Sequence, residues 1–260
     1  MPPPPLLAFH NLRVMRGQKI ALDDFSLRIR TDEHVAILGP NGCGKSTLIK
    51  TITRECYPVV REDSWMKLLG HENWDVFKLR EHMGIVSNDL MHSVTGEASG
   101  RDVVLSGFFS STAIWPNHKL DPEKVSLADA ALAGLKIEHL ADRRVCEMSS
   151  GEARRVLIAR ALVHRPTALL FDEPCNSLDL SAQQSLRQTM RALANSGTAI
   201  ILVTHELADI VPEICRVVLM NHGRVVADGS KEEILQVERL AELFGVEVQM
   251  ARRDGHYYLS

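Results

Sequence analysis

The sequence predicts an α/β protein with a mostly parallel sheet flanked by helices, an antiparallel β subdomain and an inserted helical subdomain. Three observations support this fold class. The first 30 residues contain alternating apolar and polar positions, the middle is rich in Ala and Leu, and the second half alternates apolar runs with helical segments. Short buried strands that alternate with helices of about 10 to 15 residues are typical of parallel sheets with helices on their faces.

The N-terminal region is predicted to be a tail followed by two strands. Residues 1–5 contain four consecutive prolines, which cannot donate to a sheet ladder, so we expect a disordered or extended tail. Strands are expected over 6–14 and 21–30, with a turn at 16–19. Apolar and polar residues alternate in the second of these strands, as in a strand with one buried face.

The rest of the chain divides into short apolar runs, which predict buried strands, and longer segments with helical character. The expected elements are a strand over 34–38, a helix over 45–53, a helical insertion over about 89–147, a helix over 151–163, a strand over 168–171, a helix over 181–194, a strand over 199–203, a hairpin around 221–223, a helix over 231–244 and a strand near 246–250.

The composition argues against several classes of protein. With 30 Lys and Arg against 33 Asp and Glu, the 260-residue chain has a net charge of −3 and no basic field for sequence-independent binding to nucleic acid. The longest apolar runs are far shorter than the roughly 18 residues that a membrane-spanning helix needs. No secretory signal is visible, so we expect a cytoplasmic protein. The five cysteines lie far apart, so neither a disulfide framework nor a structural zinc site is expected.

A phosphate-binding motif lies between the strand expected at 34–38 and the helix expected at 45–53. Residues 39–46 read GPNGCGKS and match G-x-x-x-x-G-K-[ST]. Glycines allow backbone N–H groups to surround phosphates, and the following helix adds its positive dipole end. Lys45 is expected to reach the β- and γ-phosphates, and the Ser46 hydroxyl to ligate Mg²⁺. The expected nucleotide contacts are Gly39, Pro40, Asn41, Gly42, Cys43, Gly44, Lys45, Ser46 and Thr47.

Two carboxylates follow the apolar strand expected at 168–171. Asp172 occupies the position from which an aspartate holds Mg²⁺ in phosphate-loop proteins. Glu173 is placed to orient or deprotonate an attacking water. A strand that ends in Asp-Glu is a weak signal by itself, and the motif at 39–46 makes it a strong one.

Three further motifs make the chain resemble an ATP-binding cassette (ABC) ATPase subunit. Residues 148–152 (MSSGE) and the helix after them resemble the signature motif of that family. Residues 171–179 (FDEPCNSLD) resemble its second nucleotide motif with the D-loop, and residues 203–206 (VTHE) resemble its switch histidine. The resemblance covers an ABC ATPase domain over about 6–235, which leaves 236–260 as a short C-terminal extension.

The resemblance implies a phosphate-loop NTPase core that hydrolyses ATP with Mg²⁺. It also implies an ATP-dependent, head-to-tail homodimer in which two ATP molecules lie between the subunits. One subunit would supply the phosphate loop, with Glu173 as the general base. The implied catalytic residues are Glu173, His205 and Lys45, and the residues implied on the partner's side of the nucleotide are Ser149, Gly151 and Asp179.

Several positions depart from the family pattern. Asn88 stands where the family has the Q-loop glutamine, which ligates Mg²⁺, and its side chain is one methylene shorter. The aromatic residue that stacks on adenine aligns with Met15 or Arg16, and the planar guanidinium of Arg16 is able to stack on a base. Ser150 and Glu152 replace a Gly and a Gln of the signature.

Three functions remain open at this point. The first is the ATPase subunit of an ABC transporter, which works on the inner face of the cell membrane and powers a separate integral-membrane permease. The helical segment and the C-terminal sequence of this chain resemble those of import subunits for metal chelates and molybdate-like oxyanions. The second is a soluble ABC ATPase that acts on ribosomes, DNA or iron–sulfur assembly, although tandem cassettes, coiled coils and zinc modules are missing. The third, another phosphate-loop enzyme such as a kinase, is disfavoured by the signature and the switch histidine. No nucleic-acid partner is expected.

Overall fold

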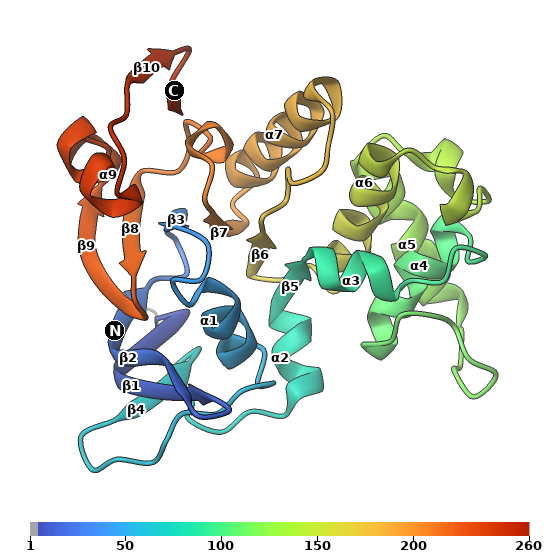
Figure 1. Ribbon diagram of the computed structural model, residues 1–260. Coiled ribbons are helices and arrows are strands. Elements are labelled where there is room, and N and C mark those ends of the chain that lie inside the picture. Colours follow the sequence, from blue (N-terminus) through green and yellow to red (C-terminus); the bar gives the residue numbers. More distant parts are fainter. Residues whose placement is uncertain (1–4, 260) are drawn as a thin grey trace. The chain divides into compact units, whose positions relative to one another are not determined.

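The computed structural model describes residues 5–259, so most of the proline-rich tail expected at 1–5 lies outside the described residues. The chain forms two compact units (Figure 1). Unit 1 combines Met1–Val76 with Ala194–Ser260, and unit 2 is Phe77–Leu193. Among the described residues, no helix is both long and apolar enough to cross a bilayer.

An antiparallel sheet begins unit 1, with the strand order β2–β1–β4. Phe25, Leu27 and Ile29 are buried in β2, as their alternation with polar residues predicts. The turn between β1 and β2 contains Gly17, whose φ of 60° suits a tight hairpin. The third strand was not expected from the sequence. The bounds are β1 (Leu7–Arg16), β2 (Lys19–Ile29) and β4 (Trp65–Leu68).

Unit 1 also contains four strands in the order β7–β3–β8–β9. The strand β3 is parallel to both of its neighbours, whereas β9 returns antiparallel to β8. Every residue of β3 and β7 is buried, which is typical of parallel strands that are covered on both faces. The helix after β3 packs on β1 and β2. The bounds are β3 (Val35–Leu38), α1 (Lys45–Ile52), β7 (Ala199–Thr204), η4 (Leu207–Asp209), β8 (Arg216–Asn221) and β9 (Arg224–Ser230).

The C-terminal part of unit 1 differs from the expectation in two places. The single helix expected over 231–244 is wrong, because Gln236 has an extended backbone (φ −116°, ψ 143°) that divides it into two helices. The strand expected near 246–250 is misplaced, because a hairpin turns at Asp254–Gly255 with left-handed φ values of 51° and 78°. The bounds are α8 (Lys231–Ile234), α9 (Val237–Phe244), β10 (Met250–Arg253) and β11 (His256–Leu259).

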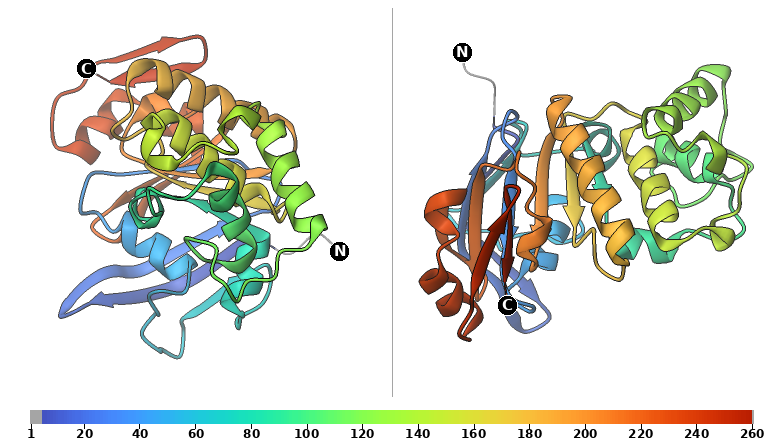
Figure 2. Two further views of the ribbon diagram at one scale, coloured as in Figure 1. Left: turned by 90° about the vertical axis from the view of Figure 1, so that its right-hand side faces the viewer. Right: turned by 90° about the horizontal axis from the view of Figure 1, so that it is seen from above.

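Unit 2 contains the parallel strands β5 and β6 and a group of helices (Figure 2). Val86 of β5 lies opposite Phe171 of β6, so the two strands end at the same edge. Figure 2 shows α4, α5 and α6 as a group, in green to yellow, and these helices pack on one another. The bounds are α2 (Val76–His82), β5 (Met83–Val86), α3 (Asn88–Ser93), α4 (Gly100–Ser106), η1 (Gly107–Phe109), α5 (Pro122–Gly134), η2 (Glu138–Leu140), η3 (Val145–Glu147), α6 (Ser150–Leu162), β6 (Ala168–Asp172) and α7 (Leu180–Asn195).

The helix α6 is tied to the segment in which the helical subdomain is expected. Arg160 Nε donates to Ser106 Oγ at 3.1 Å, and its Nη2 donates to the carbonyl oxygen of Ser111 at 2.7 Å. Burial lowers the pKa of Arg160 to about 10. The segment 89–147 contains the helices α3 to α5 and the turns η1 to η3. Its limits as a subdomain, and the domain limits at 6–235 and 236–260, stay predictions.

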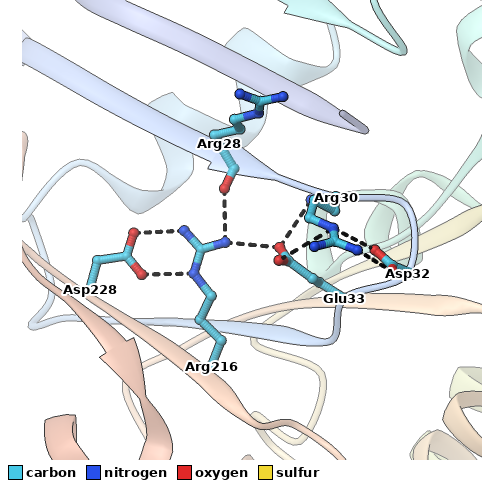
Figure 3. A network of polar contacts seen from close by, with 6 residues as sticks. All are labelled: Arg28, Arg30, Asp32, Glu33, Arg216 and Asp228. Carbon is cyan, nitrogen blue, oxygen red and sulfur yellow. Dashed lines mark hydrogen bonds and ion pairs between the residues drawn. The ribbon is translucent and has the colours of Figure 1, made fainter. Parts of the chain in front are cut away.

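A polar network in unit 1 joins the end of β2 to the β8–β9 hairpin (Figure 3). Arg216 forms two parallel bonds with Asp228, Nε to Oδ1 at 2.8 Å and Nη2 to Oδ2 at 2.7 Å. Its Nη1 donates to the Arg28 carbonyl oxygen and to Glu33 Oε2, both at 2.8 Å. The hydrogen bonds to Asp228 raise the pKa of Arg216. One guanidinium thus joins segments that are far apart in the sequence.

Replacing Arg216 by methionine should lower the free energy of unfolding by about 1–2 kcal/mol, because Asp228 and Glu33 lose a charged partner at a partly exposed site. Chemical denaturation measures the effect. Arg28→Met is the matched control, since the Arg28 side chain points away from Arg216 and only its carbonyl oxygen joins the network (Figure 3). Equal losses in the two variants would show that the Arg216 network does not stabilise the fold.

Candidate active site

The loop 39–44, between β3 and α1 in unit 1, is held by its carbonyl oxygens. Cys43 O accepts a hydrogen bond from Gly223 N at 2.8 Å, and Gly44 O accepts one from Leu48 N at 2.9 Å. These bonds direct the carbonyl groups into the protein. Gly39 N and Cys43 N donate within the protein, to Thr204 O and Pro40 O, so an anion would be bound by N–H groups elsewhere in the loop and at the start of α1.

Lys45 begins α1 and is only 6% exposed. Its Nζ donates to Gly39 O at 2.7 Å and to Pro40 O at 3.1 Å, so the ammonium group crosses the loop. Phosphates surrounded by the loop would lie within its reach. Ser46 is exposed in the first turn of α1, whereas Thr47 is buried. The Ser46 hydroxyl therefore lies on the solvent side of the loop.

Glycine is required at three positions of this loop. Gly42 and Gly44 have φ values of 81° and 112°, in the left-handed region that favours glycine. At Gly39 the limit is space, because a Cβ atom there would lie 2.7 Å from Cys43 Sγ and still closer to the Met220 carbonyl oxygen. The loop is therefore packed directly against the end of β8. Asn41 and Gly42 are exposed at its tip.

His205 follows the last residue of β7 in unit 1. The Thr204 hydroxyl fixes the turn after the strand: it accepts from Glu206 N at 3.0 Å and donates to Asp209 Oδ2 at 3.4 Å. His205 Nε2 lies 3.6 Å from Glu206 Oε1. The main chain around the histidine is therefore held by a buried hydroxyl and a buried carboxylate, and neither was selected from the sequence.

Arg16, the candidate for contact with adenine, lies at the end of β1 in unit 1. Its side chain is exposed, and Nη1 donates to Cys56 Sγ at 3.3 Å. One planar face at the end of a hairpin remains compatible with stacking on a base.

In unit 2, Asp172 is the last residue of β6, and Glu173 follows it directly. Glu173 has a φ of 45°, which is uncommon for a residue with a side chain. Its carbonyl oxygen accepts from Asn176 N at 3.1 Å, so a tight turn begins here. Strained backbone of this kind is concentrated at active sites.

The N-terminus of α6, also in unit 2, carries the signature. Ser149 Oγ accepts from Glu152 N at 3.2 Å, and Glu152 Oε2 accepts from Ser149 N at 2.8 Å, which forms a capping box. Arg143 Nη1 lies 3.1 Å from the other carboxylate oxygen of Glu152. The bond from Ser149 N, with the nearby Arg143 charge, holds the pKa of Glu152 below its usual value. Glutamate and glutamine both serve in this motif, so the Gln-to-Glu departure keeps the cap.

Gly151 and Asp179 both lie next to Ala182, in the first turn of α7. A Cβ atom on Gly151 would lie 2.8 Å from the Cβ of Ala182. Asp179 Oδ1 accepts from Ala182 N at 2.8 Å and so caps the start of α7. The signature and D-loop residues of one copy are thus neighbours within unit 2.

Asn88 begins α3, directly after Ser87, which caps that helix by accepting from Leu90 N at 3.2 Å. The Asn88 Oδ1 atom accepts a hydrogen bond from Nη2 of Arg154 in α6. Arg154 was not selected from the sequence. Helical spacing from buried Leu157 would have placed it on the inward face of α6 and marked it as a buried charge.

The predicted site residues are distributed over both units. Unit 1 contains the loop 39–47, Arg16 and His205, and unit 2 contains Asn88, Ser149, Gly151, Asp172, Glu173 and Asp179. Comparison with known proteins decides the family. The family model described as ABC transporter matches residues 22–176, more than half of the chain.

This chain belongs to the ABC transporter ATPase family. The ABC ATPase is 32% identical over 262 residues to the hemin import ATP-binding protein HmuV of Plesiomonas shigelloides, with 93% of this chain and 95% of that protein covered. It is also similar to the solved structure of an ABC transporter assigned to the metal-chelate type, with a TM-score of 0.79, 25% identity and coverage of 98% and 96%. A third relative, cbiO1 of Clostridium perfringens, part of the ABC transporter complex cbiONQ, gives a TM-score of 0.76 at 29% identity, with 92% and 94% covered.

The comparisons confirm the predicted fold class and the family. Members of this family are ATPases coupled to transport, so ATP is the substrate of the ABC ATPase.

Gly39→Ala should weaken nucleotide binding more than tenfold, on the order of the loss expected from displacing an anion-binding loop. It should also lower the free energy of unfolding by about 1–3 kcal/mol, because the new methyl group collides with the end of β8. Titration with a fluorescent ATP analogue and chemical denaturation test both effects. Gly134→Ala, at the end of α5, is the control, since Gly134 does not have a left-handed φ and nothing lies within 4 Å of its Cβ position. Unchanged affinity in Gly39→Ala would contradict the packing described for the loop.

Proposed function

We propose that the ABC ATPase powers import of a metal chelate through a separate integral-membrane permease, from the cytoplasmic face of the cell membrane. The observation that carries this proposal is a phosphate loop and a capped signature helix in a chain that is similar over 93% of its length to a hemin import ATP-binding protein. The similarity to an ABC transporter assigned to the metal-chelate type supports the same class of cargo.

ATP is proposed to bind with its phosphates against residues 39–47. The N–H groups of the loop and of the first turn of α1 would surround the phosphates, and Lys45 would turn from the loop carbonyls to them. The Arg16 guanidinium is proposed to stack on the adenine ring.

Hydrolysis is proposed to proceed by attack of a water that Glu173 deprotonates, with His205 at the γ-phosphate. The exposed Ser46 hydroxyl and the Asp172 carboxylate are oxygen donors of the kind that Mg²⁺ prefers. When bound there, Mg²⁺ would neutralise charge on the phosphates. Asn88 offers a third oxygen at the carboxyl end of β5, but this oxygen already accepts from Arg154.

Two copies are proposed to close head to tail on two ATP molecules. The 13-residue helix α6 presents the positive end of its dipole together with Ser149 and the Gly151 backbone. In the capping box the Ser149 Oγ atom accepts a bond, so its hydroxyl proton is available to a γ-phosphate held by the other copy. Asp179, which lies near Gly151, would then also face the other copy.

Glu173→Gln should reduce the ATPase rate by about 10²–10⁴-fold, because the amide cannot take a proton from water. The variant should still bind ATP and should form a dimer in its presence, which size-exclusion chromatography coupled to light scattering detects. Glu238→Gln on α9 is the control and should behave as wild type. Near wild-type hydrolysis in Glu173→Gln would exclude Glu173 as the base, and a strictly monomeric variant in ATP would count against the closed dimer.

Lys45→Ala, introduced into the organism that encodes the chain, should abolish growth on hemin as the iron source and leave growth on simple iron salts intact. The reason is that phosphate binding, and with it the coupled import, depends on the loop ammonium. Lys67→Ala is the control, at a half-buried lysine of β4 that pairs with Glu72. Retained growth on hemin together with a new requirement for molybdate would replace the metal chelate by an oxyanion as cargo.

A further inference from the structure

Arg154 places a guanidinium group on the inward face of α6. It is 4% exposed and shares this face with the buried residues Leu157, Ile158 and Ala161. Burial lowers the pKa of the guanidinium, and the charges of Cys175 and then Asp172 oppose that shift. A cation in such surroundings destabilises a fold unless it is paired, and an apolar side chain would pack at least as well. Packing alone therefore does not explain why an arginine occupies this position.

In the described part of the chain, the Arg154 side chain donates a single hydrogen bond, and Asn88 receives it. Nη2 donates to Oδ1 of Asn88, whereas Nε and Nη1 are buried and have no hydrogen-bond partner within residues 5–259. A guanidinium has five N–H donors, and within residues 5–259 most of those of Arg154 are unused. The neighbouring Arg155 also has a buried Nε without a partner in the described residues, but its Nη2 donates to the carbonyl oxygen of Leu135 and not to Asn88. Arg154 is thus the arginine that connects the signature helix to the Q-loop position.

Asn88 and Asp172 lie at the same edge of unit 2. Val86 is opposite Phe171 in the β5–β6 pair, so Asn88 opens α3 two residues beyond the end of β5, while Asp172 is the last residue of β6. The helix α6 packs on β5 and begins at the signature. Arg154 therefore bridges the helix that presents the signature and the edge from which the carboxylates project.

We propose that Arg154 is a positioning residue that holds Asn88 to the signature helix, so that Asn88 is a mechanical link and not a direct Mg²⁺ ligand. An amide oxygen beside a guanidinium lies in a positive field, and a divalent cation at the same atom would be repelled. A displacement of α3 is passed through this bond to α6 and its N-terminus. The inference rests on the proposed hydrolytic role of Glu173 and on the proposed place of Asn88 in the site.

The first test measures kcat and KM for ATP in Arg154→Met, Asn88→Ala and the double variant. Each single variant should lower kcat about tenfold with KM changed by less than about twofold, and the double variant should lose about the same tenfold, because all three break one link. Arg155→Met is the matched control on the same helix and should keep its kcat within about twofold.

Methionine has a similar length and removes the buried charge, so Arg154→Met is expected to fold. Arg154→Lys serves as a second variant: it retains the charge and a single donor direction, and it should recover part of kcat. A wild-type kcat in both Arg154 variants would overturn the inference. So would a loss of about a hundredfold in the double variant, since the two residues would then act independently.

The second test does not depend on activity. Mn²⁺ replaces Mg²⁺, and its affinity in the presence of ATP is measured by electron paramagnetic resonance in the Glu173→Gln background. Adding Asn88→Ala should change this affinity by less than about twofold, whereas loss of a direct ligand should weaken it more than about tenfold. A loss of affinity of more than about tenfold would overturn the inference. Failure of the proposed hydrolytic mechanism is seen separately, as residual ATPase activity of Glu173→Gln alone.

Discussion

The backbone hydrogen bonds that hold loop 39–44 to the segments at the ends of β7 and β8 are the constraint on which the phosphate loop depends. A phosphate site built from peptide N–H groups requires that the carbonyls of the same peptides point elsewhere. The strand β3 lies between two parallel neighbours, and both of them contribute: Thr204 O at the end of β7 accepts from Gly39 N at 3.4 Å, and Gly223 N beyond β8 donates to Cys43 O. The loop is therefore clamped from both sides.

This clamp explains features that otherwise look unrelated. Gly39 has no room for a methyl group, because the loop is packed against the Met220 carbonyl. The β8–β9 hairpin has to stay in place for the same reason, and Arg216 joins it to the end of β2. Thr204, whose carbonyl receives the loop, also uses its hydroxyl to shape the turn at His205. Side chains far from the loop thus determine how its backbone is presented.

The helix α6 has the corresponding role in unit 2. Its N-terminus is capped by Ser149 and Glu152. Arg154 of this helix donates to Asn88 in α3, and Arg160 donates to Ser106 in the helical segment. Such a helix cannot shift alone, because each arginine would carry its partner along. If the proposed permease displaces the helical segment, these bonds would carry the displacement to the signature.

The sequence was sufficient to identify the motifs but not to identify the residues that hold those motifs in place. Strand and helix positions around residues 39–46 and 168–173 followed from apolar runs and glycine spacing, which are local properties. The break at Gln236 depends on backbone angles that no residue type dictates, and β4 and β5 were too short to stand out. The Asp254–Gly255 dipeptide is a recognisable hairpin turn signal, so the β10–β11 hairpin is readable from the sequence.

The contact between Arg154 and Asn88 joins residues 66 positions apart in the sequence, and only the packing of α6 against β5 brings them together. The same holds for Gly223 and Cys43 in the clamp. Motifs therefore identify the residues that meet the nucleotide, and tertiary packing identifies those that hold them.

Mixing two inactive variants tests most directly that each ATP site is built from two copies of the chain. Lys45→Ala has no functional loop, and Ser149→Arg has no functional signature. In a mixed dimer the loop of the second variant meets the signature of the first and completes one site. We expect each variant alone to be inactive and an equimolar mixture to recover about a quarter of the wild-type ATPase rate, since half of the dimers are mixed and each has one complete site. A mixture as inactive as its components would contradict a site shared between two copies.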